Sequence, residues 1–540
     1  MLIQKPTYGQ TYQEFKWDIP KNYNIGVDVC DKWADGSGRL ALIQEKSPTD
    51  ISRYTFDQLK QYSNQFARVL QKAGVGKGDR VGILLAQGVE TAIAHIAVYK
   101  LGAIAIPLFS LFGIDALQYR LSNSGAKALV TNDEGMAKLQ DIRSSLGQLQ
   151  AVFNIDANES NGSALAFWPA LRLEAADFTP VKTLAEDPAV IIYTSGTTGK
   201  PKGALHAHRV LLGHLPGVEM SHNFLPAEGG VMWTPADWAW IGGLFDVLMP
   251  AWHHGIPVVA CRFDKFTAEA AFELMARHQV TNTFLPPTAL KMMRHIENPQ
   301  QRWRLNLRTI ASGGESLGLE LIEWGKRNLG LTINEFYGQT ECNMIVSACS
   351  ALFEPQIGSI GKAVPGHVLD IVDEQGNALP NGQEGNIGVR TPDPVMFLEY
   401  WQNPEATREK FAGAYLVTGD IGVRDADGFI RFVGRNDDVI TSAGYRIGPG
   451  PIEDCILGHP AVSMVAVIGL PDAERTEVVS AFVVLNEGVA PSEELKKDIQ
   501  AHVRHRVAAH EYPRQIHFVR ELPMTTTGKI IRRELRQQRF

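Results

Sequence analysis

One stretch of this chain reads Tyr193-Thr194-Ser195-Gly196-Thr197-Thr198-Gly199-Lys200-Pro201-Lys202-Gly203, directly after the apolar run Ala189-Val190-Ile191-Ile192. The apolar run predicts a buried strand, and the segment after it has the composition of a loop that holds a polyphosphate. Glycines let several backbone N–H groups converge on one anion, hydroxyls add further donors, and a lysine supplies a mobile positive charge.

This stretch is not a Walker A loop, which has a longer spacer between its glycines and ends in Gly-Lys-Ser or Gly-Lys-Thr. Here only Thr197 and Thr198 separate Gly196 from Gly199, and Pro201 follows Lys200. The alternative to a phosphate loop is a solvated Gly/Ser/Thr turn, which is the commoner meaning of such residues. The order of the residues decides between the two.

From Thr194 to Gly203 that order resembles, without a mismatch, the signature of the adenylate-forming enzymes: acyl-CoA synthetases, firefly luciferase and the adenylation domains of peptide synthetases. In that family the loop wraps the β- and γ-phosphates of ATP. The resemblance covers about residues 54–536. It implies phosphate contacts from Thr194, Ser195, Gly196, Thr197, Thr198, Gly199 and Lys202, with Thr194 and Lys202 also serving the reaction.

Length and composition describe an ordinary globular protein of more than one domain. The chain has 540 residues, of which 44% are hydrophobic and 21% charged, and this length exceeds what one core usually covers. The formal net charge of −7 argues against a general surface for nucleic acids or anionic membranes. The five cysteines are scattered and form no Cys-x-x-Cys pair, so neither a zinc site nor a disulfide framework is expected.

The longest apolar region, residues 81–114, is interrupted by Glu90, His95 and Lys100, so no membrane span is expected. The N-terminal residues do not resemble a secretory signal or an Arg-rich transit peptide. We expect a soluble cytoplasmic protein. The sequence leaves the oligomeric state open.

Helical patterns alternate with short β-rich runs from about Tyr54 onward, which predicts a parallel α/β sheet with ligand loops at the carboxyl ends of its strands. After about Pro365 turn-rich segments flank short strands, as in a small β subdomain. The expected fold class is therefore α/β. Residues 1–435 form a large N-terminal domain with parallel-rich sheets, and residues 436–540 form a small mobile α+β domain, as the resemblance implies.

A second motif is Glu335-Phe336-Tyr337-Gly338-Gln339-Thr340-Glu341, which follows the β-like residues 331–334. Its polar groups are expected to emerge at the end of that strand. Mg²⁺ prefers oxygen ligands and is usually shared between carboxylates and substrate phosphates. Gln-Thr-Glu by itself also fits a helix cap. The match to the family's Tyr-Gly-Gln-Thr-Glu motif implies that Glu341 binds Mg²⁺ and that Thr340 contacts AMP.

Further nucleotide contacts are implied by resemblance. The turn Gly313-Gly314-Glu315-Ser316 matches the family's adenine pocket, and the motifs around Asp420 and Arg435 match those that bind the ribose. Asp420 offers two acceptor oxygens to the ribose hydroxyls and Arg435 offers donors, although isolated Asp and Arg residues are usually surface charges. The expected ATP and AMP contacts beyond the phosphate loop are Gly314, Glu315, Ser316, Glu335, Phe336, Tyr337, Gly338, Gln339, Thr340, Asp420, Arg435 and Lys529.

The C-terminal domain carries the remaining expected chemistry. Lys529 lies in a Thr/Gly-rich loop and matches the family's terminal lysine, which implies contact with the substrate carboxylate and the α-phosphate during adenylation. Asp437 stands where relatives have a hinge, and an ordinary Asx turn is its alternative. The implied CoA contacts are Ala443, Gly444, Tyr445, Arg446, Arg475 and Arg504.

These residues predict an acid–thiol ligase. A carboxylate attacks the α-phosphorus of MgATP and yields an acyl-adenylate and pyrophosphate, and the thiol of CoA then attacks the adenylate. No protein nucleophile is needed, because positioning and electrostatics supply the catalysis. The alternatives are an enzyme that loads a separate carrier protein and a nucleotide-binding regulator without catalysis.

The acid substrate is less defined by the sequence. The aromatic segment around Trp240 fits an acyl pocket or an ordinary core, and the family places the acyl pocket here. Acetate-specific relatives close that pocket with tryptophan where this chain has Gly338, and with a β-branched residue where it has Gly313. Both glycines are expected to enlarge the pocket. We therefore expect a short-to-medium-chain fatty acid, with an aromatic acid as the alternative.

Overall fold

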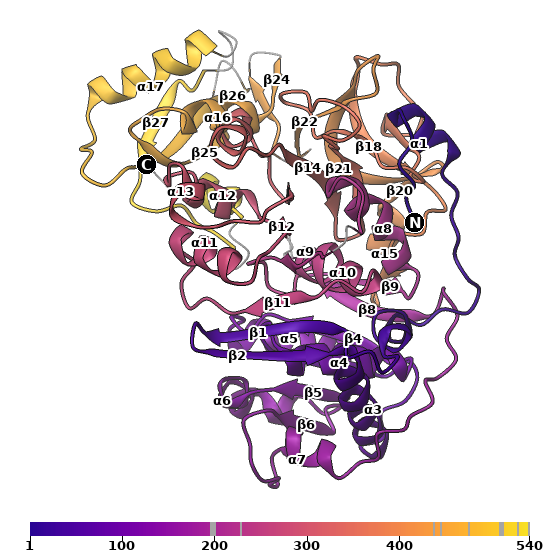
Figure 1. Cartoon of the computed structure of the whole chain (residues 1–540). Coiled ribbons are helices and arrows are strands. Elements are labelled where there is room, and N and C mark those ends of the chain that lie inside the picture. The colour runs from indigo at the N-terminus through magenta and orange to yellow at the C-terminus, as the bar shows by residue number, and fades with distance from the viewer. Residues whose placement is uncertain are drawn as a thin grey trace.

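The computed structural model describes residues 1–194, 201–226, 229–435, 438–442, 445–472, 476–506, 512–525 and 529–537, and for Thr441, Tyr445, Arg446, His505 and Arg506 the backbone alone. Figure 1 shows two stacked sheets in the N-terminal part, a β subdomain at the upper right and a C-terminal unit in yellow at the upper left. Within the described residues, no helix combines the length and the apolar character that a membrane crossing requires.

One sheet has eight strands in the order β19-β9-β8-β4-β3-β5-β6-β7. Its central strands are parallel, whereas β8 and β9 are antiparallel. The expected phosphate loop therefore connects two antiparallel neighbours. The strands are β3 (Arg80–Leu84), β4 (Ile104–Leu108), β5 (Ala128–Thr131), β6 (Ala151–Asn154), β7 (Leu165–Ala166), β8 (Pro188–Tyr193), β9 (Gly203–Ala207) and β19 (Glu399–Tyr400).

The helices of this region include the amphipathic helix α3 (Phe56–Lys72). It begins with a capping box, because Thr55 and Gln58 exchange side-chain and backbone hydrogen bonds, and its apolar face is buried in the largest core cluster. The other helices of this region are α4 (Val89–Lys100), α5 (Ile114–Ser124), α6 (Asp133–Ile142), η2 (Arg143–Ser145) and α7 (Phe167–Arg172). They follow the α/β alternation that the sequence predicts.

A second sheet has nine strands in the order β16-β15-β14-β13-β12-β10-β11-β1-β2. They are β1 (Leu40–Ser47), β2 (Asp50–Thr55), β10 (Met232–Trp233), β11 (Val258–Cys261), β12 (Asn282–Phe284), β13 (Thr309–Gly313), β14 (Ile333–Gln339), β15 (Cys342–Ser347) and β16 (Lys362–Ala363). From β1 to β14 the neighbours are parallel, and the outer strands β2, β15 and β16 are antiparallel to theirs.

The helices associated with this half of the chain are α8 (Val210–Ser221), α9 (Ile241–Gly243), η3 (Leu244–Leu248), α10 (Met249–His253), α11 (Ala268–Arg277), α12 (Pro287–Met293), α13 (Pro299–Arg302), α14 (Leu319–Trp324) and η4 (Gly325–Leu329). All residues of α8 are buried, so this helix belongs to the core and has no solvent face. At the N-terminus lie α1 (Tyr8–Glu14), α2 (Ile25–Asp28) and η1 (Asp31–Trp33).

The expected β subdomain is a five-stranded antiparallel sheet. It comprises β17 (Leu369–Val372), β18 (Glu384–Arg390), β20 (Phe411–Ala412), β21 (Tyr415–Arg424) and β22 (Ile430–Arg435), with α15 (Pro404–Glu409) before β20. The antiparallel pair β21 and β22 sets Asp420 directly opposite Arg435. This register brings together two residues that the sequence separates by a turn.

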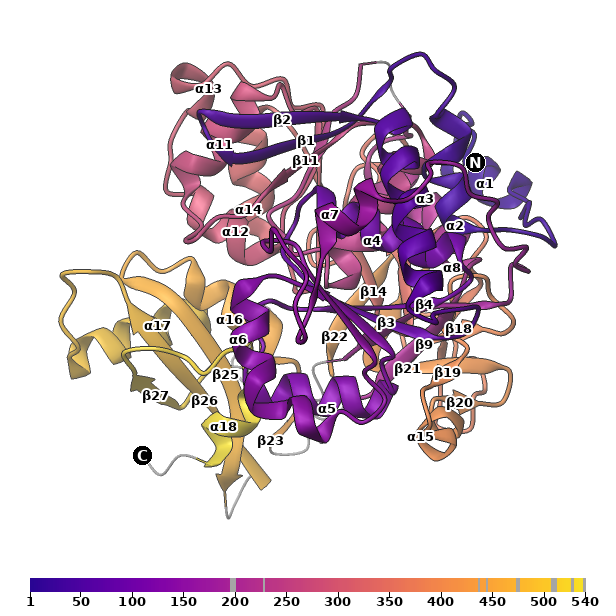
Figure 2. The same cartoon turned by 90° about the horizontal axis from the view of Figure 1, so that it is seen from below.

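The C-terminal unit has its own five-stranded sheet and its own core cluster. Figure 2 shows this unit, in yellow, to one side of the N-terminal sheets. Its elements are β23 (Ile440–Ser442), β24 (Tyr445–Ile447), α16 (Pro449–Leu457), β25 (Val462–Asp472), β26 (Thr476–Leu485), α17 (Glu493–Arg506), β27 (Gln515–Phe518) and α18 (Arg532–Gln537).

Candidate active site

A cavity of about 550 Å³ collects residues from both sheets, the β subdomain and the C-terminal unit. Its lining includes most of the residues that the sequence singles out: Thr194, Lys202, Trp240, Gly314, Glu315, Ser316, Glu335, Phe336, Tyr337, Gly338, Gln339, Thr340, Glu341, Asp420, Arg435 and Lys529. Segments more than 300 residues apart in the chain, such as Thr194 and Lys529, thus border one space.

Strand β14 and the turn after it contribute the longest continuous part of the lining, since every residue from Glu335 to Glu341 borders the cavity. The sequence predicts these residues after the end of a strand, and this prediction is wrong for Glu335 to Gln339, which lie within β14. A regular strand would point alternate side chains away from the cavity. The pairing of β14 with β15 shifts register between Tyr337 and Gln339, and such an irregularity redirects side chains.

Asp420 is buried and accepts two hydrogen bonds from residues of β14. The hydroxyl of Tyr337 donates to its Oδ2 at 2.5 Å, and Nε2 of Gln339 donates to the same oxygen at 2.7 Å. Nε of Arg435 lies 3.8 Å from Oδ1. Burial raises the pKa of Asp420, and the hydrogen bonds from Tyr337 oppose that rise. The carboxylate is thus fixed in orientation, with one oxygen toward the arginine.

Glu341 lies in the turn between β14 and β15, and its side chain is buried. The hydroxyl of Tyr400 donates a hydrogen bond to its Oε1. Nζ of Lys202 lies 4.7 Å from the centroid of the Tyr400 ring, so Tyr400 contacts both the carboxylate and the lysine of the phosphate loop. A single carboxylate bordering a cavity is a donor set that fits Mg²⁺ shared with substrate phosphates.

Lys529 borders the cavity, and its backbone is hydrogen-bonded to that of Thr525 and to its side chain. The backbone N–H of Thr525 donates to the carbonyl of Lys529 at 2.7 Å, and the N–H of Lys529 donates to Oγ1 of Thr525 at 3.0 Å. Its Nζ lies 5.8 Å from the centroid of the Trp240 ring. Burial lowers the pKa of the Lys529 ammonium, and the carboxylate of Glu315 opposes that fall.

An ion network anchors α18, the helix that follows Lys529. Nη2 of Arg532 donates to both oxygens of Glu453, at 2.8 and 2.9 Å, and Nη1 lies 3.5 Å from Oδ2 of Asp438. Nη2 of Arg536 donates to Oδ1 of Asp438 at 3.1 Å. Asp438 thereby joins the beginning of the C-terminal unit to the helix next to Lys529.

The two ends of the glycine-rich stretch pair with each other, because the N–H of Thr194 donates to the carbonyl of Lys202 at 2.9 Å. Several predicted residues lie outside the described part of the chain: Ser195, Gly196, Thr197, Thr198, Gly199, Asp437, Ala443, Gly444 and Arg475. Tyr445 and Arg446 are described by their backbone in β24. Arg504 is exposed on α17 and lies 5.5 Å from the Tyr512 ring centroid, and it does not border the cavity.

The expectation that Gly313 and Gly338 both enlarge the acyl pocket is wrong. A Cβ atom at Gly313 would lie 2.6 Å from Cε2 of Phe336, so the Phe336 ring fills the room beside this glycine. Gly313 itself does not border the cavity. Gly338 borders it, but its missing side chain would meet N of Met344 at 2.4 Å and Cα of Asn343 at 2.5 Å. The room that these glycines leave is taken by the protein.

This packing predicts that Gly338→Ala destabilises the fold. The contacted atoms are backbone atoms of buried β15, which cannot yield as a flexible side chain would, and overpacking of this kind costs about 1–3 kcal/mol. The measurement is the free energy of unfolding in urea. Gly147→Ala is the control, because a Cβ at Gly147 meets nothing within 4 Å. Equal stability of the Gly338 variant and the wild type would contradict this account.

The raised pKa of the buried Glu335 carboxyl predicts that the stability of the substrate-free protein depends on pH. Burial raises the pKa of this carboxyl from 4.5 to about 8, and it raises the pKa of the nearby Asp454 to about 7. The native state keeps protons that the unfolded chain releases in this range. The unfolded state therefore binds fewer protons, and the free energy of unfolding falls as the pH rises from about 5 to about 8.

The measurement for Glu335 is the melting temperature across this pH range for the wild type and for Glu335→Gln. The glutamine carries no charge at any pH and keeps an oxygen for the N–H of Leu317, which donates to Glu335 at 3.1 Å. We expect the wild type to lose stability toward alkaline pH and the variant to lose less. Identical pH profiles would show that Glu335 does not hold its proton.

Other lining residues were missed by the sequence analysis. They include Phe109, Phe112, Arg120, Ile360, Tyr400, Lys410 and Phe432. None of them belongs to a motif. One signal was available for Arg120, because this arginine lies on the apolar face of its helix, three residues after Leu117 and directly before Leu121.

Comparison with known proteins now adds to this geometry. The sequence model described as "AMP-binding enzyme" matches residues 31–401, and the one described as "AMP-binding enzyme C-terminal domain" matches residues 451–529. Acyl-coenzyme A synthetase ACSM4, mitochondrial, of Rattus norvegicus is 34% identical over 97% of this chain and 91% of its own length. Acyl-coenzyme A synthetase ACSM3, mitochondrial, of Homo sapiens is 33% identical over 99% of this chain and 92% of its own length.

Solved structures agree with these relatives. The anthranilate CoA ligase AuaEII in complex with anthranoyl-AMP is 31% identical, with a TM-score of 0.87 over 96% of this chain and 98% of that one. An acyl-CoA synthetase of Brucella canis is 32% identical, with a TM-score of 0.77 over 99% of each chain. The family models place the chain in the class of the AMP-binding enzymes. The cavity between the two sheets and the small C-terminal unit agrees with this class. Within this class the chain belongs to the acyl-CoA synthetases.

Proposed function

We propose that this ATP-dependent acyl-CoA ligase activates a carboxylic acid longer than acetate, with short-to-medium-chain fatty acids as its substrates. The ligase reaction and the choice of acid are both supported by one observation. A single cavity places the charged residues Lys202, Glu341, Asp420, Arg435 and Lys529 beside an apolar wall that contains Trp240 and Phe336. A charged nucleotide and an apolar acyl chain can therefore meet in one space.

In the first half-reaction a carboxylate oxygen attacks the α-phosphorus of ATP, and pyrophosphate leaves. Lys529 is proposed to stabilise the negative charge that develops between the carboxylate and the α-phosphate. Asp420 is proposed to bind the ribose hydroxyls, because its hydrogen bonds to Tyr337 and Gln339 hold the carboxylate in one orientation. Gly314, Glu315 and Ser316 would border the adenine.

Mg²⁺ would be held by Glu341 together with the substrate phosphates, and it would neutralise part of their charge. The hydroxyl of Tyr400 orients this carboxylate, and Lys202 adds a positive charge on the other side of the Tyr400 ring.

In the second half-reaction the thiol of CoA attacks the acyl-adenylate. We place the domain boundary between residues 435 and 436, where β22 of the β subdomain ends. The C-terminal unit would rotate about Asp437 and exchange the Lys529 turn for the segment 443–446. Arg475 and Arg504 are proposed to bind CoA phosphates. Arg504 is exposed and free to contribute to such a surface site after rotation.

An aromatic acid is the second candidate substrate. The structural neighbour with 31% identity carries anthranoyl-AMP, and aromatic side chains such as Phe109, Phe112 and Phe336 line the cavity. A cytoplasmic location is proposed because all five cysteines are free, as is usual in a reducing compartment. The mammalian relatives are named as mitochondrial, so cell fractionation would test this location.

The test of the proposed function is pyrophosphate release with MgATP across straight-chain acids from acetate to decanoate and with benzoate, each with and without CoA. CoA-dependent turnover that peaks beyond acetate supports the proposal. A peak at acetate or benzoate overturns the acid assignment. Pyrophosphate release that CoA does not accelerate points to a carrier protein as the acceptor, and nucleotide binding without turnover of any acid points to a regulator.

A further inference from the structure

Arg120 is a buried cation that borders the cavity without a carboxylate partner among the described residues. Its exposed fraction is 6%, and its Nη1 donates to the carbonyl of Ala116 at 2.9 Å. Its Nε is buried and has no hydrogen-bond acceptor within the described chain. Burial lowers the pKa of this guanidinium, and the neighbouring Tyr193 and Tyr119 oppose that fall. Burying such a charge costs free energy unless an anion or a hydrogen-bond acceptor pairs with it.

Aromatic rings hold the guanidinium in place. Its Cζ lies 4.0 Å from the centroid of the Phe112 ring and 5.7 Å from that of Tyr193. Cation–π contacts orient the flat group without consuming its N–H donors. The arginine is therefore fixed in position beside the cavity.

Helix α5, which carries Arg120, is bound to both ends of the glycine-rich stretch. The hydroxyl of Tyr119 donates to the carbonyl of Pro201 at 3.0 Å. At the other end, Tyr193 donates to Oδ1 of Asn123 at 2.7 Å. Strands β4 and β8 are parallel neighbours, so their carboxyl ends lie at the same edge of the sheet.

The other cavity cations have different surroundings. Lys410 donates to the carbonyl of Thr418 at 3.0 Å, Arg435 lies 3.8 Å from Asp420, and Lys529 lies beside Trp240. Arg120 instead borders the cavity together with Tyr193, Thr194 and Lys202, where the chain enters and leaves the glycine-rich stretch. An anion at this end of the cavity would meet Arg120.

We propose that Arg120 is a binding residue for the β- and γ-phosphates of ATP and for the pyrophosphate formed from them. The proposal rests on the proposed function. When the carboxylate oxygen bonds to the α-phosphorus, the bond from that phosphorus to the bridging oxygen breaks, and its electron pair stays on pyrophosphate. Negative charge thus grows on the leaving group, and a fixed guanidinium at this position compensates it.

The experiment is isothermal titration calorimetry with magnesium pyrophosphate, MgATP and AMP, which needs neither an acid nor turnover. We expect Arg120→Gln to weaken pyrophosphate and ATP binding by about 10- to 100-fold and to leave AMP binding unchanged, because AMP lacks the two phosphates. Arg120→Lys keeps the charge without the planar fork, and we expect a smaller loss. If the glutamine variant does not fold, the same titrations are made with the lysine variant.

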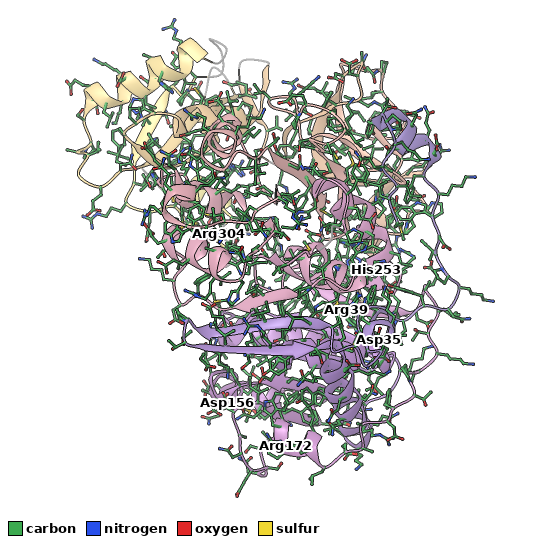
Figure 3. The ribbon with its side chains drawn as sticks, viewed as in Figure 1. Asp35, Arg39, Asp156, Arg172, His253 and Arg304 are labelled. Carbon is green, nitrogen blue, oxygen red and sulfur yellow. The ribbon has the colours of Figure 1, made fainter. Side chains whose placement is uncertain are left out.

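The matched control is Arg172→Gln, because Arg172 is exposed at the end of α7 and lies at the lower end of the molecule in Figure 3. Equal weakening of AMP and pyrophosphate would overturn the proposal in favour of a structural role. Unchanged binding of pyrophosphate and ATP by Arg120→Gln would also overturn it. Arg120-dependent pyrophosphate binding by a protein that turns over no acid would support this proposal while the proposed function fails.

Discussion

Lys529→Ala is expected to slow acyl-adenylate formation by about 100- to 1,000-fold, the usual effect of removing one fixed group that stabilises transition-state charge. Lys529 borders the cavity beside Trp240, and its backbone exchanges two hydrogen bonds with Thr525. The measurement is the acid-dependent exchange of labelled pyrophosphate into ATP, which reports the first half-reaction alone.

The second half-reaction distinguishes a chemical role of Lys529 from a general loss of structure. Supplied with synthetic acyl-adenylate and CoA, the alanine variant should form acyl-CoA at close to the wild-type rate. Lys265→Ala is a suitable control, because this lysine is outside the cavity lining. If both half-reactions slow equally, the lysine does not act specifically in adenylation.

Glu341→Gln is expected to lower kcat/KM for ATP by about 100-fold or more, since loss of a metal ligand removes several kcal/mol of stabilisation of phosphate charge. Glutamine has nearly the same shape and still accepts the hydrogen bond from Tyr400, so a large effect would reflect the lost charge. The measurement is the dependence of pyrophosphate release on Mg²⁺ concentration.

Tyr400→Phe serves as the companion variant for Glu341. It removes the hydroxyl that contacts the carboxylate and keeps the ring beside Lys202. We expect it to raise the Mg²⁺ requirement far less than Glu341→Gln does. A glutamine variant with an unchanged Mg²⁺ requirement would refute the assignment of Glu341 as the metal ligand.

The sequence was sufficient where local pattern or motif decides the structure. Helix α3 agrees with the helical patterns that the sequence shows from about Tyr54 onward, and its capping box of Thr55 and Gln58 is a local feature of the same kind. The α/β class followed from the alternation of strands and helices. The resemblance singles out Asp420 and Arg435 from separate motifs, and the register of β21 with β22 sets them opposite each other; their role as ribose contacts stays a prediction.

Features that depend on packing between distant segments could not be predicted. Tyr400 reaches Glu341 across 59 residues of sequence, and no local pattern marks it. The argument about Gly313 failed for the same reason: a missing side chain indicates room, but only the fold determines that the Phe336 ring fills it. The motif Glu335–Glu341 was placed after its strand because a register shift cannot be read from one strand alone.

Strand β14 has a consequence for how this enzyme can change. β14 and the turn after it border the cavity from Glu335 to Glu341, and Tyr337 and Gln339 of this strand also donate hydrogen bonds to Asp420. A substitution in this strand therefore disturbs several parts of the cavity together. New acid preferences should arise in lining residues outside it, such as Phe109, and directed evolution toward another substrate would accumulate changes there while β14 stays constant.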